Sequence, residues 1–157
     1  MTADESIYRQ ELRLRVCGLL VKDDHILLAQ IHSPVIDDLI WTPPGGGLQY
    51  GETMVEGVKR EFLQETNLQI TVHDLLHINE LVQQPFHAVE FYFEVEKRGG
   101  ELKLGTDPEL GWNQQLMHDL QWVPLDDLDE IVFAPENLLP KLLQWNQRSS
   151  FHPFKSP

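Results

Sequence analysis

The sequence has few of the features that mark secreted proteins and membrane proteins. Its 157 residues include one cysteine, Cys17, so no disulfide can form within the chain. No stretch approaches the roughly 18 apolar residues of a membrane span, and residues 1–6 (MTADES) lack the basic and apolar parts of a secretory signal. We therefore expect a cytoplasmic protein without a membrane partner, in which Cys17 is a small buried hydrophobic residue.

Positive charge is also scarce. The sequence has 12 Lys and Arg residues against 25 Asp and Glu residues, which gives a net charge of −13. Proteins that bind DNA or RNA polymers need basic surface to neutralise phosphates, so we expect no such partner. A small phosphorylated substrate is still compatible with this charge, because bound cations would supply positive charge locally.

The motifs of several common enzyme classes are missing as well. The seven histidines show no H-E-x-x-H spacing, and the sequence has no P-loop, no G-x-S-x-G and no repeats. Hydrophobic residues make up 41% and charged residues 24%, as in ordinary globular proteins. The length suits one domain over residues 1–157, and we expect loose ends at 1–8 and 149–157.

Hydrophobic periodicity predicts several strands and two helices. Residues 12–21, 26–29, 87–97 and 120–123 read as strands, and residues 70–82 as two strands or one bent strand. Asp23-Asp24 predicts a hairpin turn. Apolar residues at helical spacing predict a central helix with a buried stripe, and residues 135–145 a terminal helix. The stripe is Met54, Val55, Val58 and Phe62. These elements predict an α/β (α+β) layered domain.

The strand over 87–97 alternates clearly between two faces. One face carries Val89, Phe91, Phe93 and Val95, and the other carries Glu90, Tyr92, Glu94 and Glu96. In residues 12–17, leucines and a valine alternate in the same way with two arginines and Cys17. Both strands are therefore predicted to be half buried, with their polar faces away from the core.

One stretch carries most of the chemical information. A glycine-rich segment, residues 45–52 (GGGLQYGE), precedes residues 60–65 (REFLQE) in the predicted central helix. Glycine lets the backbone approach a ligand closely. Glu61 and Glu65 are four residues apart, so they share one helix face, with Gln64 beside them. Oxygen ligands gathered in this way suit Mg²⁺ or Mn²⁺, which then bind substrate phosphates.

This spacing resembles the signature of the Nudix family of pyrophosphohydrolases, G-x5-E-x7-R-E-U-x-E-E-x-G-U, where U is a bulky aliphatic residue. The pattern begins at Gly46, and Phe62 stands at its first U. The other matching positions are Glu52, Arg60, Glu61, Glu65 and Leu68. Two positions depart from it. Gln64 replaces an acid, and Asn67 replaces the glycine, although asparagine also adopts the left-handed conformation that ends helices.

The resemblance implies an α/β/α sandwich with a curved mixed sheet. It implies divalent-metal-dependent hydrolysis of a pyrophosphate bond in a nucleoside diphosphate linked to another moiety, in a nucleoside triphosphate or a nucleotide-sugar such as ADP-ribose. The alternative is a catalytically weak Nudix-fold module that binds a nucleotide, because Gln64 removes a charge from the metal site. A homodimer is left open.

The resemblance also assigns roles to the matching residues. Glu65 would be the principal metal ligand, and Glu61 a ligand or the general base. Gly45 would offer its carbonyl, and Gln64 would be a weaker ligand because its amide oxygen carries no charge. The two remaining assignments are Arg60, which would orient the carboxylates, and Glu52, which would hold the loop by pairing with Arg60.

A further acid would come from a later loop. Glu109 is the first candidate because it precedes the strand that contains Trp122-Val123-Pro124. Glu101 and Asp107 compete with it, and Glu90 and Glu94 are weaker candidates.

Substrate recognition is open at this level. Trp41, Phe86 and Tyr92 are candidates to stack on an aromatic ring, and packing in the core is the alternative for each. Arg13 and Arg15 lie on one strand face, where they would meet a terminal phosphate or form surface salt bridges.

Overall fold

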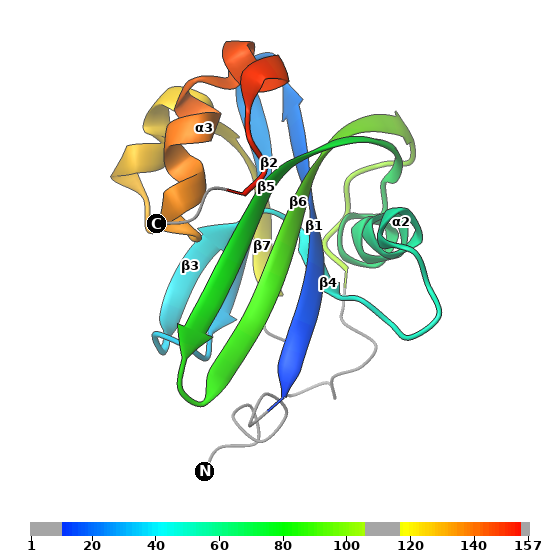
Figure 1. Cartoon of the computed structure of the whole chain (residues 1–157). Helices are drawn as coiled ribbons and strands as arrows, with labels where there is room; N and C mark the ends of the chain where they lie inside the picture. The colour runs from blue at the N-terminus through cyan, green and yellow to red at the C-terminus, as the bar shows by residue number, and fades with distance from the viewer. Residues whose placement is uncertain (1–10, 106–116, 155–157) are drawn as a thin grey trace.

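The computed structural model describes residues 11–105 and 117–154. Its strands form a seven-stranded sheet in the order β3-β2-β1-β6-β5, with β4 beside β1 and β7 beside β2 (Figure 1). β1 and β6 are parallel and the other pairs antiparallel. The strands are β1 (Leu12–Lys22), β2 (His25–Ser33), β3 (Asp38–Thr42), β4 (Gly45–Gly47), β5 (Gln69–Gln83), β6 (Phe86–Gly99) and β7 (Met117–Pro124). The helices are α2 (Met54–Thr66) and α3 (Leu139–Leu143), with 3₁₀ helices η2 (Leu125–Glu130), η3 (Glu136–Leu138) and η4 (Trp145–Ser150).

The sheet separates into two halves at the β1–β2 hairpin. Asp23 and Asp24 form the predicted turn, and both have positive φ angles, 52° and 59°, as a two-residue hairpin turn requires. β1 and β2 pair only beside this turn, at residues 21–22 and 25–26. Beyond it β1 pairs with β4 and β6, whereas β2 pairs with β3 and β7. The two halves therefore diverge.

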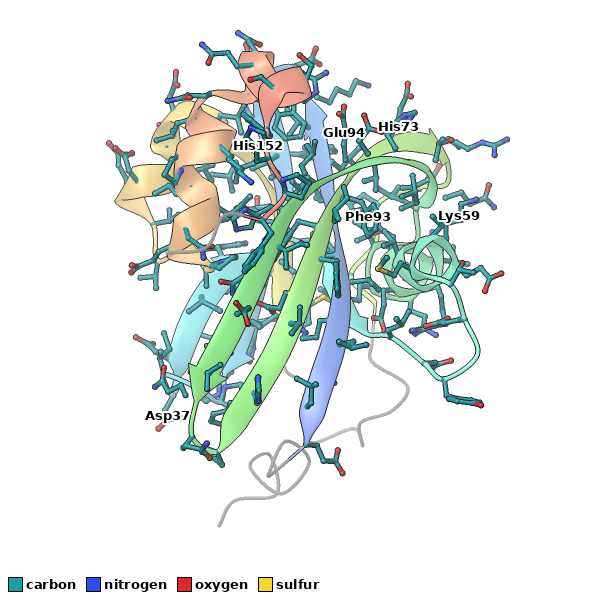
Figure 2. All side chains as sticks on the ribbon, in the orientation of Figure 1. Asp37, Lys59, His73, Phe93, Glu94 and His152 are labelled. Atoms are coloured by element: carbon teal, nitrogen blue, oxygen red, sulfur yellow. The ribbon has the colours of Figure 1, made fainter. Side chains whose placement is uncertain are left out.

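Helices cover both faces of the sheet, as the predicted α/β/α arrangement requires (Figure 1). On one face, α2 packs through Val58 and Phe62, and Phe93 of β6 points to the same side (Figure 2). The other face packs against η2, η3, α3 and η4 through Leu128, Leu138 and other apolar side chains. The mixed α+β fold is confirmed. Within the described residues, no helix has the length and apolar character needed to cross a membrane.

Helix α2 has defined signals at both ends. At its start, Thr53 Oγ1 accepts from the Glu56 backbone N–H at 3.1 Å, and the Glu56 carboxylate accepts from the Thr53 N–H at 3.0 Å. This reciprocal capping box was not predicted, although the T-x-x-E spacing signals it. At its end, Asn67 adopts the left-handed conformation expected of it, with φ 63°, and its N–H donates to the Leu63 carbonyl.

The buried face of α2 differs in part from the prediction. Val58 and Phe62 are fully buried, but Met54 is 37% and Val55 42% exposed. Burial begins instead at Gly57, where a Cβ atom would lie 2.9 Å from the Leu48 side chain. The helix can approach the sheet closely from Gly57 onward because that position has no side chain.

The C-terminal region also departs from the prediction. Residues 135–145 do not form one helix, because Pro140 lacks an N–H and is tolerated only in the first turn of α3. The end at residues 149–154 is not loose. Lys141 Nζ donates to the His152 carbonyl at 2.6 Å, and the Ile78 N–H of β5 donates to the Pro153 carbonyl at 2.7 Å.

The strand faces require one correction that bears on function. Residues 69–83 form one bent strand, β5, and the alternation over β6 is present. However, Leu12 and Leu14 are 61% and 42% exposed, whereas Glu90 is 6% and Tyr92 1% exposed. The face predicted to be polar and outward therefore points between the two halves of the sheet.

Candidate active site

The first two residues of strand β4 lie very close to their neighbours. A Cβ atom at Gly45 would lie 2.4 Å from the Val16 carbonyl oxygen and 2.6 Å from Cys17 Sγ. At Gly46 it would lie 2.5 Å from Oε2 of Glu61. At Gly45 the contacts with backbone exclude a side chain, whereas a side chain at Gly46 would displace the Glu61 carboxylate. The backbone of β4 therefore lies directly against the Glu61 carboxylate.

The two helix carboxylates meet neighbouring glycines of β4. Glu65 Oε2 accepts a hydrogen bond from the Gly45 N–H at 2.8 Å, and Glu61, 6% exposed, packs against Gly46. The i, i+4 spacing predicted from the sequence thus places both acids on the helix face that meets the glycine segment.

Arg60 connects the helix to the preceding loop. Its Nε and Nη2 donate to the two carboxylate oxygens of Glu52 at 3.0 and 2.7 Å, and Nη2 also donates to the Gly47 carbonyl at 2.9 Å. Its Nη1 donates to Glu61 at 2.8 Å and to Gln64 Oε1 at 3.3 Å. All five N–H donors of the guanidinium have acceptors.

This arrangement shifts the pKa values of the paired groups. The hydrogen bond from Arg60 lowers the pKa of Glu52, and the same bond is the largest contribution that raises the pKa of Arg60. Both groups therefore stay charged at neutral pH. Nearby, burial raises the pKa of the Cys17 thiol to about 12. Cys17 is 1% exposed, a buried thiol as the sequence predicts.

A cavity of about 630 Å³ opens beside these groups, lined by residues from both halves of the sheet. Glu65 and the three glycines of β4 form part of its wall. Four of the residues proposed from the sequence to bind substrate line it: Arg13, Arg15, Phe86 and Tyr92. Trp41 does not. It packs against the apolar cluster on the C-terminal side, and its backbone bonds to Val132 and Ala134.

Arg15 is committed to a partner inside the cavity wall. Its Nη1 donates to Oε2 of Glu90, and Asn79 Nδ2 donates to the other oxygen of Glu90 at 2.8 Å. Burial opposes the charge of Arg15, but the Glu90 carboxylate raises its pKa. Arg15 thus forms a salt bridge, as one of the two sequence alternatives has it, but in the cavity wall rather than on the outer surface.

The other candidate acids lie elsewhere. Glu109 and Asp107 fall outside the described residues. Glu101 is exposed, and its backbone carbonyl accepts from Asn67 Nδ2. Glu94 pairs with Arg148 of η4 at 3.0 Å. Among the described residues, Glu61 and Glu65 are the helix carboxylates that meet the glycine segment.

The donor set fits a divalent cation held with help from substrate. Across the described residues, no group of three or more His, Cys, Asp and Glu side chains is arranged to hold a metal ion. Glu61 and Glu65 nevertheless supply hard oxygen donors at the glycine segment, beside the amide of Gln64. Mg²⁺ is commonly held by one or two carboxylates together with substrate phosphates, so two acids suffice.

Three polar residues beside the cavity were missed by the sequence analysis. His77 and Asn79 lie on β5, and Asn137 lies in η3. Asn137 Nδ2 donates to Asn79 Oδ1 at 2.8 Å, and His77 Nε2 lies 2.9 Å from Asn137 Oδ1. No local pattern signals these contacts, because they join segments 58 and 60 residues apart.

Comparison with known proteins gives consistent matches. The sequence model of the NUDIX domain matches residues 11–145. An ADP-ribose pyrophosphatase from Methanocaldococcus jannaschii is 28% identical over 132 residues, covering 83% of this chain and 72% of that protein.

Solved structures resemble the fold at low sequence identity. A MutT NUDIX hydrolase from Burkholderia pseudomallei superposes with a TM-score of 0.70 and 22% identity, covering 86% of this chain and 98% of the other. A NUDIX hydrolase from Nitrosomonas europaea gives 0.71 and 16% identity, with 94% and 98% coverage.

The buried ring of His77 predicts a pH-dependent stability. Burial lowers its pKa in the folded protein, so the unfolded chain binds more protons there as the pH falls. The contribution of neutral His77 to the free energy of unfolding is therefore complete above about pH 6.5 and declines below it. We expect His77→Gln, which retains an N–H for Asn137, to lose less free energy of unfolding between about pH 7.5 and about pH 5 than the wild type.

Urea unfolding at both pH values measures this difference. His87→Gln is the matched control, because His87 is exposed on the neighbouring strand β6. This control should keep the pH dependence of the wild type. An equal loss in the wild type and His77→Gln would show that His77 does not contribute.

Proposed function

The chain belongs to the Nudix family of pyrophosphohydrolases, and we propose that it hydrolyses the pyrophosphate bond of a nucleoside diphosphate linked to another moiety, with Mg²⁺ or Mn²⁺ as cofactor. The observation that carries the proposal is the placement of Glu61 and Glu65 against Gly46 and Gly45, beside a cavity of about 630 Å³. This volume is in the range of small-molecule sites.

The residues of the site have separate tasks in this proposal. Glu61 and Glu65 would hold the cation, with the Gln64 amide oxygen and the Gly45 carbonyl as further donors. A divalent cation, when bound, neutralises phosphate charge and makes water more acidic. Glu61 is also the candidate to accept the proton of the attacking water. Arg60 orients Glu61, and Glu52 in turn holds Arg60.

The cavity supports a nucleotide as substrate. Its walls include Ile40, Phe86 and Phe133, which offer apolar surface to a flat ring, while Arg13 lies in the wall beside Gly47. Arg13 would then meet phosphate. The similarity to a protein named ADP-ribose pyrophosphatase favours nucleotide-sugars among the substrates to test first.

We also propose that the protein is one domain, that its location is cytoplasmic and that it has no nucleic-acid polymer as partner. Two further predictions are that Glu109 is an added metal ligand and that the protein can form a homodimer.

A panel of nucleoside triphosphates and nucleotide-sugars tests the proposal. With Mg²⁺ or Mn²⁺, we expect release of a nucleoside monophosphate from at least one compound. Glu65→Gln should reduce turnover by about 10²- to 10³-fold, the effect of removing one electrostatic stabiliser. Its fold should be retained, because Glu65 is only partly buried.

Chromatography of the products and thermal unfolding of the variant provide the readout. Glu101→Gln is the control, since the Glu101 side chain is exposed and the residue accepts the hydrogen bond from Asn67 through its backbone carbonyl. No turnover of any compound, together with calorimetric binding of a nucleotide that stays intact, would support the binding module instead. Wild-type activity in Glu65→Gln would overturn the assignment of the ligand.

Gln64 predicts an altered metal requirement. Its oxygen accepts from Arg60 on the guanidinium nitrogen that also binds Glu61. Gln64→Glu adds a negative charge there, and a unit charge 4 Å from a divalent cation in water contributes about 2 kcal/mol, twice the value for two unit charges. We therefore expect the Mg²⁺ concentration for half-maximal activity to fall by up to about thirtyfold.

Activity titrations and calorimetric Mn²⁺ titrations of both proteins measure this shift. Gln69→Glu, at an exposed position just beyond the helix, is the control for a change in net charge alone. Coincident curves for the wild type and Gln64→Glu would contradict a metal role for residue 64 and leave its bond to Arg60 as its function.

A further inference from the structure

A continuous chain of hydrogen bonds crosses the wall of the cavity, away from the carboxylates of α2. It runs from Arg15 of β1 through Glu90 of β6 and Asn79 of β5 to Asn137 of η3, and it ends at His77 of β5. Four of these five residues line the cavity, and the fifth, His77, lies buried behind it. This series of hydrogen bonds thus connects the interior of the sheet to Asn137 at the cavity surface.

The direction of every bond in this chain is fixed from one end. Arg15 can only donate, and the Glu90 carboxylate can only accept. Asn79 must therefore turn its NH₂ toward Glu90, which leaves its Oδ1 to accept from Asn137 Nδ2. The amide of Asn137 is then oriented with its oxygen toward His77. Neither amide can flip without placing two donors or two acceptors face to face.

His77 closes the chain at the other end. Because Asn137 Oδ1 only accepts, the proton of the neutral ring must lie on Nε2. Nδ1 then carries a bare lone pair, and among the described residues it has no hydrogen-bond partner. The ring, 6% exposed, is packed 5.8 Å from the ring of Tyr92, which restrains its position. His77 therefore fixes the acceptor side of Asn137 as Asn79 fixes the donor side.

Asn137 has hydrogen-bonding capacity left over. Nδ2 has two hydrogens and Oδ1 two lone pairs, and each atom uses one of them in the bonds to Asn79 and His77. Asn137 is exposed and lines the cavity. A donor and an acceptor side by side, in a fixed order, match the edge of a nucleobase, whose own donor and acceptor are adjacent and rigid. Ribose hydroxyls rotate freely and have no such order.

We propose that Asn137 binds the hydrogen-bonding edge of the substrate's nucleobase, and that His77, Asn79 and Glu90 are positioning residues that hold its amide in one orientation. This rests on the proposed function, because it takes the cavity as the nucleotide site. The apolar side chains of Phe86 and Phe133 line the same cavity and would contact the base ring. The base is thereby selected by an Asn137 amide whose orientation is fixed by hydrogen bonds to Asn79 and His77 of the sheet.

Binding of products without metal tests the inference separately from hydrolysis. In EDTA, calorimetry compares AMP, GMP, CMP and UMP with ribose 5-phosphate, which lacks a base. We expect the wild type to bind at least one nucleotide about tenfold or more tighter than ribose 5-phosphate and to distinguish among the four bases, as one bidentate contact allows. Asn137→Ala should abolish most of this difference while its binding of ribose 5-phosphate stays unchanged.

Three further variants separate positioning from a structural role. His77→Phe removes the donor to Asn137 and should reduce the discrimination among bases. His77→Gln should restore it, because its amide N–H can take the place of Nε2–H. Glu136→Gln, next to Asn137 at the cavity, should keep the wild-type discrimination. Thermal unfolding identifies any variant that fails to fold. In that case the discrimination among bases by Asn137→Ala, at an exposed position, decides whether the inference holds.

The outcomes are distinct. Equal binding of all nucleotides and ribose 5-phosphate by the wild type would overturn the inference, and so would full discrimination in Asn137→Ala or His77→Phe. Selective nucleotide binding that is lost in Asn137→Ala supports it, even where no compound is hydrolysed. That last combination would contradict the proposed function alone.

Discussion

The guanidinium of Arg60 is the group on which the site depends. It lies between β4 and α2 and donates to acceptors on three segments. These are the Gly47 carbonyl of β4, Glu52 of the loop, and Glu61 and Gln64 of the helix. A planar fork of five donors can satisfy four acceptor groups at once. A lysine ammonium, with three donors on a flexible stem, cannot reproduce this geometry.

The rest of the site follows from this connection. With the loop held, β4 can run so close to β1 and α2 that no side chain fits at Gly45 and one at Gly46 would displace the Glu61 carboxylate. The carboxylates of Glu61 and Glu65 then face backbone rather than water on one side. Two acids placed in this way beside a cavity give a local negative charge that attracts a cation, and a bound cation in turn attracts phosphate. In the proposed function, metal binding and base recognition therefore use different parts of the same cavity wall, represented by Glu65 and Asn137.

How much the sequence could predict depends on the distance along the chain. The glycine segment, Glu52, Arg60 and the two acids lie within residues 45–65. Helix geometry placed the two acids on one face, and the family resemblance supplied the pairing of Glu52 with Arg60. The pair of Arg15 and Glu90 joins residues 75 apart, and that of Asn79 and Asn137 residues 58 apart. Such contacts depend on strand register and on where η3 returns to the sheet, which local periodicity does not contain.

The burial of the polar strand face has the same origin. Alternation placed Arg15 and Glu90 on polar faces, and an isolated buried charge would indeed be unfavourable. In the fold each neutralises the other across adjacent parallel strands, so both can face inward. The helix predicted over residues 135–145 failed for a simpler reason. The apolar periodicity continues through Pro140, but proline is accepted only in the first turn of a helix, so α3 has only five residues.

Hydrogen exchange at the Gln49 amide tests the central role of Arg60 most directly. This N–H donates to Oε1 of Glu52, the oxygen that Arg60 Nη2 also holds. In Arg60→Lys we predict faster exchange at Gln49 and at Gly45, whose N–H donates to Glu65, with unchanged exchange across β5 and β6. Lys59→Gln, at the exposed neighbouring position (Figure 2), should match the wild type. Unchanged exchange at Gln49 in Arg60→Lys would contradict the account.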